Sequence, residues 1–206
     1  GTTSFFPSKN LGCIGDGGAL FTRDRDLAQT ATSITNHGGS IRYQHDRVGL
    51  NSRLDSLQAA ILRVKLPHLN THISQRQKAA SIYDDLLKSV EGVDIPERDE
   101  KSTHVFNQYT LKVEGEIRDE LARGLAEDKV PTGVYYPKGI HEQKAFEGLG
   151  YKRGDFPITE KLSKTVLSLP MHTELSSAQQ KYIVARLVTR LRDIKDSDED
   201  RGNSKH

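Results

Sequence analysis

Beyond residue 102 the sequence alternates between short apolar stretches and longer stretches with helical periodicity, and this alternation constrains the fold most. HVFNQYTLKV (104–113) and VPTGVYYP (130–137) have the composition of strands, and RDELARGLAED (118–128) between them has that of a helix. Three further helices are predicted over 141–150, 156–169 and 176–194. Strands and helices that alternate at this density indicate an α/β or α+β domain.

The first ninety residues follow a different pattern. Short strands are predicted at 2–6 and 19–22, and a helix runs from Asp24 to the Gly38-Gly39 pair, with His37 at its C-terminal end. Apolar residues at helical spacing then predict two helices, over 52–66 and 68–90, with a bend at Pro67. Such a kinked helix pair commonly joins domains or lies in an interface, although a plain surface helix would show the same pattern.

Polar segments set the expected domain boundaries. Residues 91–102 (EGVDIPERDEKS) form a connector, so we expect one domain over 1–90 and a second over 91–194. The last twelve residues, 195–206, are charged and contain no apolar side chain. We expect this tail to be disordered.

Charge and hydropathy exclude several classes of protein. The 206 residues carry 30 Lys+Arg and 28 Asp+Glu, interleaved rather than gathered into a basic stripe, which argues against nucleic-acid binding. No apolar run approaches the roughly 20 residues of a membrane span, and the N-terminus lacks a signal-peptide pattern. The single cysteine, Cys13, cannot form an intrachain disulfide. These features favour a soluble cytoplasmic protein, and no metal is expected.

The stretch SFFPSKNLGCIGDGGAL (4–20) is the most suggestive chemically. Lys9 stands just before four glycines that lie within seven residues, and apolar residues flank both sides. A lysine amine is not nucleophilic near neutral pH unless its surroundings lower its pKa, and an apolar, glycine-lined pocket is one way to do so. The free amine could then form a Schiff base with an aldehyde such as pyridoxal phosphate (PLP). A surface charge on a glycine-rich turn is the alternative that the stretch alone leaves open.

Four segments together resemble a known family. SFFPSKNLGCIGDGGAL, NHGGSIRYQHDRVGLNSRLDSLQAAILRVKL, TGVYYPKGIHEQKAF and VLSLPMHTELS look like the DegT/DnrJ/EryC1/StrS family of PLP-dependent sugar aminotransferases, from Thr3 to about Arg190. The resemblance implies a fold type I PLP-dependent transferase, of which this chain holds the end of the large domain and the small C-terminal α/β domain.

The resemblance also assigns roles to individual residues. Lys9 matches the family's lysine that binds PLP as a Schiff base and later moves a proton. Ser4 and Asn51 match residues that contact the cofactor phosphate, Asn51 from the neighbouring subunit of a homodimer. The positions that tend to face the nucleotide sugar are His37, Arg53, Tyr135 and His141, although Tyr135 stands where many relatives carry histidine.

Each assignment has a plainer alternative in the residues themselves. Asn51 can cap a helix that begins near Ser52, and Arg53 can pair with a surface acid such as Asp55. His37 can complement a helix dipole, and Tyr135 and His141 can be packing or surface groups near a turn.

The resemblance implies transfer of an amino group from an amino acid, commonly glutamate, to a nucleotide-linked keto-sugar, in pathways to cell-surface polysaccharides or glycosylated natural products. The chain begins with Gly, and Lys9 comes within nine residues of it, so we expect an N-terminally truncated portion of a longer enzyme. The alternative is a non-catalytic dimerising or sugar-nucleotide-binding module derived from the same family.

Overall fold

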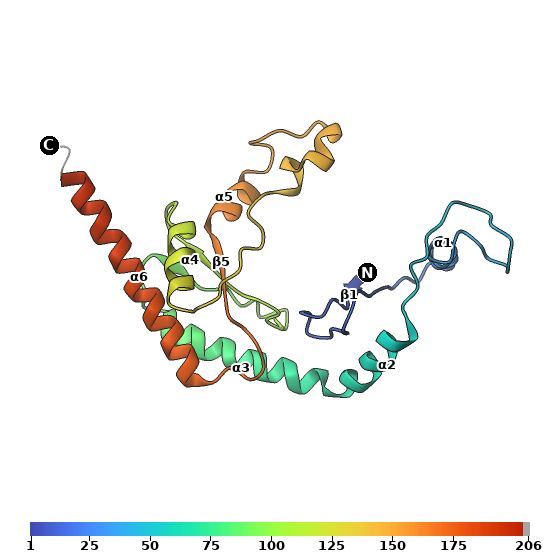
Figure 1. Cartoon of the computed structure of the whole chain (residues 1–206), viewed down its shortest axis with the longest axis horizontal. Helices are drawn as coiled ribbons and strands as arrows, with labels where there is room; N and C mark the ends of the chain where they lie inside the picture. The colour runs from blue at the N-terminus through green and yellow to red at the C-terminus, as the bar shows by residue number, and fades with distance from the viewer. Residues whose placement is uncertain (204–206) are drawn as a thin grey trace. The chain divides into compact units, whose positions relative to one another are not determined.

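The computed structural model describes residues 1–203, and these fall into two compact units that divide between His72 and Ile73 (Figure 1). The boundary falls inside helix α3 (Leu69–Leu87), whereas the sequence placed it at the polar connector 91–102. The reason is packing: Ala80, Tyr83 and Leu87 on the second half of α3 are buried in the core of the second unit. Among the described residues, no helix is long and apolar enough to cross a membrane.

The first unit begins with a two-stranded antiparallel sheet. Strand β1 (Thr2–Ser4) pairs with β2 (Gly18–Leu20), and the glycine-rich stretch is the loop between them. Helix α1 (Arg25–Thr35) follows, and Asp24 caps it because its Oδ1 accepts hydrogen bonds from the backbone N–H groups of Asp26 and Leu27. The predicted strand, loop, strand and helix are therefore confirmed, with shorter strands.

The next helix starts later than expected. Helix α2 (Ser56–Lys65) has Asp55 as its N-cap, so Asn51 does not cap it. Backbone pairing explains the shift: Leu50 N–H donates to Ile34 O (2.7 Å) and Ser52 N–H donates to Thr35 O (2.9 Å), which holds this segment extended beside the end of α1. At Pro67 the short 3-10 helix η1 (Leu66–His68) joins α2 to α3, as the predicted bend requires.

Two glycines allow a close crossing of the chain near the end of α1. Gly38 has φ +79°, and a Cβ there would lie 1.7 Å from Arg47 O. A Cβ on Gly49 would lie 2.0 Å from Gly38 N. Only residues without a side chain permit this approach, which places residues 50–53 beside residues 34–37.

The second unit is built on a three-stranded antiparallel sheet, in the order β3 (Val93–Asp94), β4 (Tyr109–Val113) and β5 (Val166–Leu169). Helix α4 (Arg118–Glu127) follows β4 and lies beside the long C-terminal helix α6 (Ser177–Asn203). Between them come two 3-10 helices, η2 (Ile140–Glu142) and η3 (Lys144–Leu149), and helix α5 (Pro157–Thr165).

Three elements of this unit differ from the sequence predictions. Residues 130–137 form no strand; only Gly133 bridges Ser168. Residues 141–150 are 3-10 rather than α-helical, and 156–169 divides into α5 and the strand β5. All four residues of β5 are buried, so its apolar run lacks the alternation that marks a half-exposed strand and cannot be told from a helix by periodicity.

Aromatic and aliphatic side chains from α3, β4, β5, α4 and α6 form one core in the second unit. Two buried tyrosines of this core form hydrogen bonds through their hydroxyl groups. Tyr83 Oη donates to Pro170 O (3.0 Å), and Tyr109 Oη donates to Asp84 Oδ1 (2.7 Å). Burial raises the pKa of both phenols, and the bond to Asp84 raises that of Tyr109 further. Both therefore remain hydrogen-bond donors over the physiological range.

The expected disordered tail is corrected in its first part. Helix α6 continues through Asn203, and Ser197 Oγ donates to Asp193 O (2.8 Å) within it. The reason is local: no glycine or proline interrupts the sequence after Ile194 until Gly202. Residues 204–206 of that prediction lie outside the described residues.

Candidate active site

The β1–β2 loop folds over itself around its glycines. Phe5 N–H donates to Gly17 O and Cys13 N–H donates to Phe5 O, both at 2.8 Å. The buried Cys13 thiol lies 2.9 Å from Phe5 O and 3.0 Å from Gly15 O. A Cβ on Gly12 would lie 2.6 Å from Pro7 O, so this position requires glycine. The glycines thus shape a tight loop that carries Lys9.

Two side chains of helix α2 hold this loop in place by hydrogen bonds to its backbone. Lys65 Nζ donates to Gly12 O (2.5 Å), and Ile14 N–H donates to Gln58 Oε1 (3.0 Å). Leu54, just before α2, packs so closely that a Cβ on Gly17 would lie 2.9 Å from its Cδ1. These contacts hold the second half of the loop, from Gly12 to Gly17. Lys9 lies in the first half, which they do not involve.

Lys9 is half-buried, and its backbone N–H closes a turn onto Phe6 O (2.9 Å). Its ammonium makes no hydrogen bond or ion pair with the residues that the structure describes. Ser4, before the loop, accepts a hydrogen bond from Phe6 N–H at its Oγ (3.2 Å), so its hydroxyl hydrogen is available for a further acceptor. An unpaired amine on the loop and a hydroxyl donor at the end of β1 fit an aldehyde that carries a phosphate, which is the chemistry of PLP.

Asn51 and Arg53 come together at the chain crossing. Arg53 donates from Nε (3.2 Å) and Nη2 (2.9 Å) to Asn51 Oδ1, and from Nη1 (3.3 Å) to Asn36 Oδ1. The alternative pairing of Arg53 with Asp55 does not occur. His37 follows Asn36 in a left-handed conformation (φ 60°), and His45 Nδ1 donates to its carbonyl oxygen (3.0 Å). Among the described residues, no hydrogen bond links this group to Lys9.

A hollow of about 600 Å³ lies within the first unit beside this group. Its walls are β2, the inner face of α1 and residues 52–54, and it includes the Arg53 side chain. Much of the apolar surface of this unit is exposed, and its buried apolar side chains are those of Cys13 and Leu62. The exposed ones include Phe6, Ile14, Leu20, Phe21, Leu27, Ile41, Val48, Leu54, Leu57 and Val64.

Tyr135 and His141 lie in the second unit. Tyr135 is 47% exposed and its ring covers Gly133, where a Cβ would lie 2.6 Å from the ring. His141 is turned inward: its Nε2 lies 3.1 Å from Glu160 Oε1 and its ring packs on Phe156 at 4.8 Å. His141 therefore packs within the second unit, and its contact with the nucleotide sugar stays a prediction.

Glu160 is held mainly by backbone. Gly154 N–H donates to its Oε1 (2.6 Å), and this bond, followed by that of His141, lowers the pKa of the carboxyl group. The contact ties the loop before α5 to the helix itself. It makes His141 and Glu160 a structural pair of the second unit.

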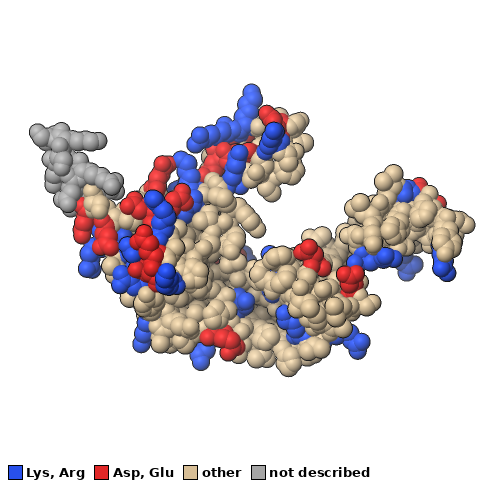
Figure 2. Space-filling model, viewed as in Figure 1, with Lys and Arg blue, Asp and Glu red and all other residues tan. Residues whose placement is uncertain are grey.

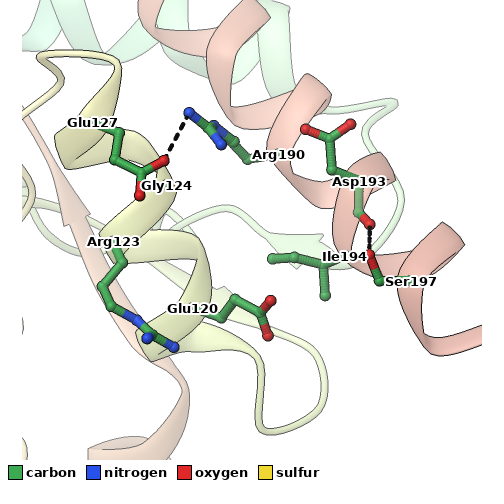
Figure 3. Close-up of a pocket in the computed structure, with 8 residues that line it drawn as sticks. All are labelled: Glu120, Arg123, Gly124, Glu127, Arg190, Asp193, Ile194 and Ser197. Atoms are coloured by element: carbon green, nitrogen blue, oxygen red, sulfur yellow. Dashed lines mark hydrogen bonds and ion pairs between the residues drawn. The ribbon is translucent and has the colours of Figure 1, made fainter. Parts of the chain in front are cut away.

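A separate pocket of about 250 Å³ lies between α4 and α6 (Figure 3). Arg190 Nη2 lies 3.2 Å from Glu127 Oε2, and Figure 3 marks this ion pair with a dashed line. Glu120 and Arg123 on α4 and Asp193 on α6 complete a nearly balanced charged lining. On the face shown in Figure 2, acidic and basic side chains are likewise interleaved over these helices. Within the described chain, no cluster of His, Cys, Asp and Glu could hold a metal ion.

Sequence reasoning missed three residues that shape the first unit. Asn36, Gln58 and Lys65 each contact a predicted site residue or its loop across a long sequence separation. Gln58 and Lys65 lie on one face of α2, and their helical spacing could have indicated a shared target. Asn36 carried no such signal, because its contact depends on the chain crossing.

The fold is that of part of a fold type I PLP-dependent transferase, and comparison with known proteins identifies the family. The family model of the DegT/DnrJ/EryC1/StrS aminotransferases matches residues 1–188. The chain therefore belongs to the DegT/DnrJ/EryC1/StrS aminotransferase family. The predicted family and fold class are confirmed.

Three similar proteins illustrate the match. A "Pleiotropic regulatory protein" of Geobacillus stearothermophilus is 47% identical over 91% of this chain and 50% of its own length. The UDP-2-acetamido-2-deoxy-3-oxo-D-glucuronate aminotransferase of Pseudomonas aeruginosa is 44% identical over 90% of the chain and 50% of its own. A crystal structure of a family member from Brucella abortus superposes with TM-score 0.80 at 40% identity, over 91% and 49% of the two chains. The chain thus spans about half the length of these relatives.

Proposed function

We propose that this chain is the lysine-bearing portion of a PLP-dependent aminotransferase that moves an amino group from an amino acid, with glutamate as donor, to a keto-sugar linked to a nucleotide. The observation that carries the proposal is Lys9, a half-buried amine without a partner on a glycine-shaped loop. Family membership supports the reaction class, and the relative from Pseudomonas aeruginosa acts on a UDP-linked 3-oxo sugar by its name. These relatives do not favour a non-catalytic module.

PLP, when bound, supplies an electron sink that stabilises charge on the carbon from which a proton is removed. Lys9 would hold the cofactor covalently through its amine and, once released, accept and return a proton at the substrate carbon as general base and acid. Ser4 would donate its free hydroxyl hydrogen to the cofactor phosphate. Lys65 and Gln58 keep the loop in the shape that presents Lys9, because they bind the backbone on its far side.

The anionic parts of the ligands need cationic or amide donors, and the first unit supplies them at the chain crossing. Arg53 carries a positive charge without an acidic partner, and Asn51 turns its amide nitrogen away from the guanidinium. We assign Asn51 to the cofactor phosphate across a homodimer interface and Arg53 and His37 to the nucleotide sugar. Tyr135, half-exposed, is a further substrate contact in this proposal. A cytoplasmic location remains part of this proposal, in line with a chain whose single cysteine, Cys13, is buried.

Amino transfer to the loaded protein tests the proposed function. After saturation with PLP and removal of the excess, addition of glutamate should release 2-oxoglutarate in proportion to the occupied sites, measured with a coupled dehydrogenase. Lys9→Arg should abolish this release, while Lys78→Arg, an exposed lysine of the second unit, should not alter it. Equal release from the Lys9→Arg variant would contradict the assignment of Lys9.

A further inference from the structure

The side chains of Asn36, Asn51 and Arg53 form one group, here called the guanidinium corner. Asn36 and Asn51 are directly opposite each other in an antiparallel bridge, and such residues project to the same face. Arg53 lies two positions beyond Asn51 along extended chain, so it projects to that face as well. Both carboxamide oxygens accept from the guanidinium, at 2.9 to 3.3 Å.

The donors of the corner are turned outward. A guanidinium has five N–H groups, and three of them point at the two oxygens in the hydrogen bonds just described, so one remains on each Nη. Because each asparagine directs its oxygen to Arg53, its NH₂ group must point away from it. No acidic side chain pairs with Arg53 among the described residues, and all three residues are exposed.

Neutral oxygen partners orient a guanidinium without cancelling its charge. A carboxylate in place of either asparagine would orient it equally well and neutralise it. The choice of two amides therefore suits a group whose positive charge is kept for a ligand, and a fork of N–H donors matches the geometry of a phosphate oxyanion.

We propose that Asn36 is a positioning residue that holds the Arg53 guanidinium ready for a phosphate-class oxyanion. The inference deepens the proposed function, on which the source of that oxyanion rests: the diphosphate of a nucleotide sugar or the monoester of the cofactor. Asn36 acts through Arg53 and needs no contact with the ligand.

Truncation of Asn36 should leave the local fold intact, because backbone bonds hold the crossing. His37 N–H donates to Leu50 O (2.9 Å), Leu50 N–H to Ile34 O (2.7 Å) and Ser52 N–H to Thr35 O (2.9 Å). None of these uses the Asn36 side chain. A change in anion affinity can therefore be separated from a loss of structure.

Isothermal titration of the 206-residue chain with inorganic pyrophosphate and, separately, inorganic phosphate at low salt tests the proposal. Arg53→Ala should abolish binding, and Asn36→Ala should weaken it about 3-fold to 10-fold, the worth of one oriented hydrogen bond. Asn36→Asp keeps the acceptor oxygen but neutralises Arg53, so it should weaken binding more than Asn36→Ala while the melting temperature stays equal or rises. Tighter binding of pyrophosphate would assign the nucleotide, and tighter binding of phosphate the cofactor.

Two exposed positions of the same unit give matched controls. Asn70→Asp adds the same charge on α3, and Arg63→Ala removes one on α2; both should bind within about 2-fold of the unchanged chain. Wild-type affinity in Asn36→Asp, or absence of pyrophosphate and phosphate binding in the unchanged chain, would overturn the inference. If the expected order of affinities appears while Lys9 fails to attach PLP, the guanidinium corner stands and the proposed function falls.

Discussion

Lys9 and Lys65 are the two lysines of the first unit, and their surroundings separate their roles. Lys65 reaches across to Gly12 O and is used by the fold, whereas Lys9 is half-buried and has no partner in the described chain. The glycine-rich loop that carries Lys9 could be predicted from the sequence, while the role of Lys9 in binding PLP stays a prediction. The partner of Lys65 could not, because it lies 53 positions away and no local pattern encodes that contact.

The same limit explains the other candidate residues. Asn51 and Arg53 stand two apart, so their proximity was predictable, but Asn36 joins them only because Gly38 and Gly49 let the chain cross itself. The inward turn of His141 depends on Glu160, which belongs to a helix that begins sixteen residues later. Long-range contacts of this kind decide whether a polar residue faces a ligand or the protein.

Asp128 gives a test of electrostatics at the residue scale. It accepts two hydrogen bonds from Arg190 (2.8 and 2.9 Å) and one from Arg186 (3.1 Å), and these lower its pKa from 3.8 to about 2. Because the folded-state pKa is depressed, the carboxylate stabilises the fold above pH 3.8 and loses that contribution as the pH falls toward about 2. Asp128→Asn should therefore flatten the decline in melting temperature over this range, as measured by circular dichroism.

An exposed carboxylate provides the control for this experiment. Asp85, whose side chain is 76% exposed, pairs with Lys88 on the helix surface, where such pairs contribute little. Asp85→Asn should leave the pH dependence of the melting temperature nearly unchanged. If the melting temperature of the Asp128→Asn variant falls as steeply as that of the unchanged chain, the ion pairs of Asp128 with Arg186 and Arg190 do not stabilise the fold as described.

At the level of elements, the helices were predicted more securely than the strands. The amphipathic patterns of α1, α2, α3, α4 and α6 are long enough to be recognised, and the caps and Pro67 fix their ends within a few residues. Strand β5 is four residues long and buried on both sides, so its sequence merges with the preceding helix. The strand expected at 130–137 contains Pro131 and Pro137, which remove backbone donors and leave a single bridge.

Helix α6 packs against the sheet and α4 through a buried apolar stripe, and Leu187 is fully buried within it. Leu187→Ala should lower the free energy of unfolding of the second unit by about 2 to 5 kcal/mol, the usual cost of truncating a core leucine. The same substitution at Leu149, which is 65% exposed, should cost much less. Chemical denaturation followed by circular dichroism measures both, and equal losses would contradict the assigned core.

At the scale of the whole molecule, the two units differ in how much apolar surface they bury. The second unit has a continuous core from Ala80 to Ile194, while in the first unit few apolar side chains are buried. The alternating strand and helix patterns beyond residue 102 predicted the core of the second unit. The exposure of apolar side chains in the first unit could not be predicted, because such residues are expected inside a folded domain.

Hydrogen exchange of the 206-residue chain should show this difference directly. Amides of β4, β5 and the buried turns of α6 should exchange at least about tenfold more slowly than those of the β1–β2 loop and residues 36–53, because local opening costs less where few contacts are buried. Peptide-resolved mass spectrometry provides the measurement. Uniform protection of both units would contradict the described burial.

Covalent trapping shows whether Lys9 is the residue that binds PLP. The chain is mixed with PLP, its visible absorbance is recorded, borohydride is added, and the labelled peptides are mapped by mass spectrometry. We expect a red-shifted band and a label on the Lys9 peptide, both lost in Lys9→Ala. Labels spread over many lysines, or a Lys9→Ala variant with the same spectrum and the same labelled peptides, would contradict it.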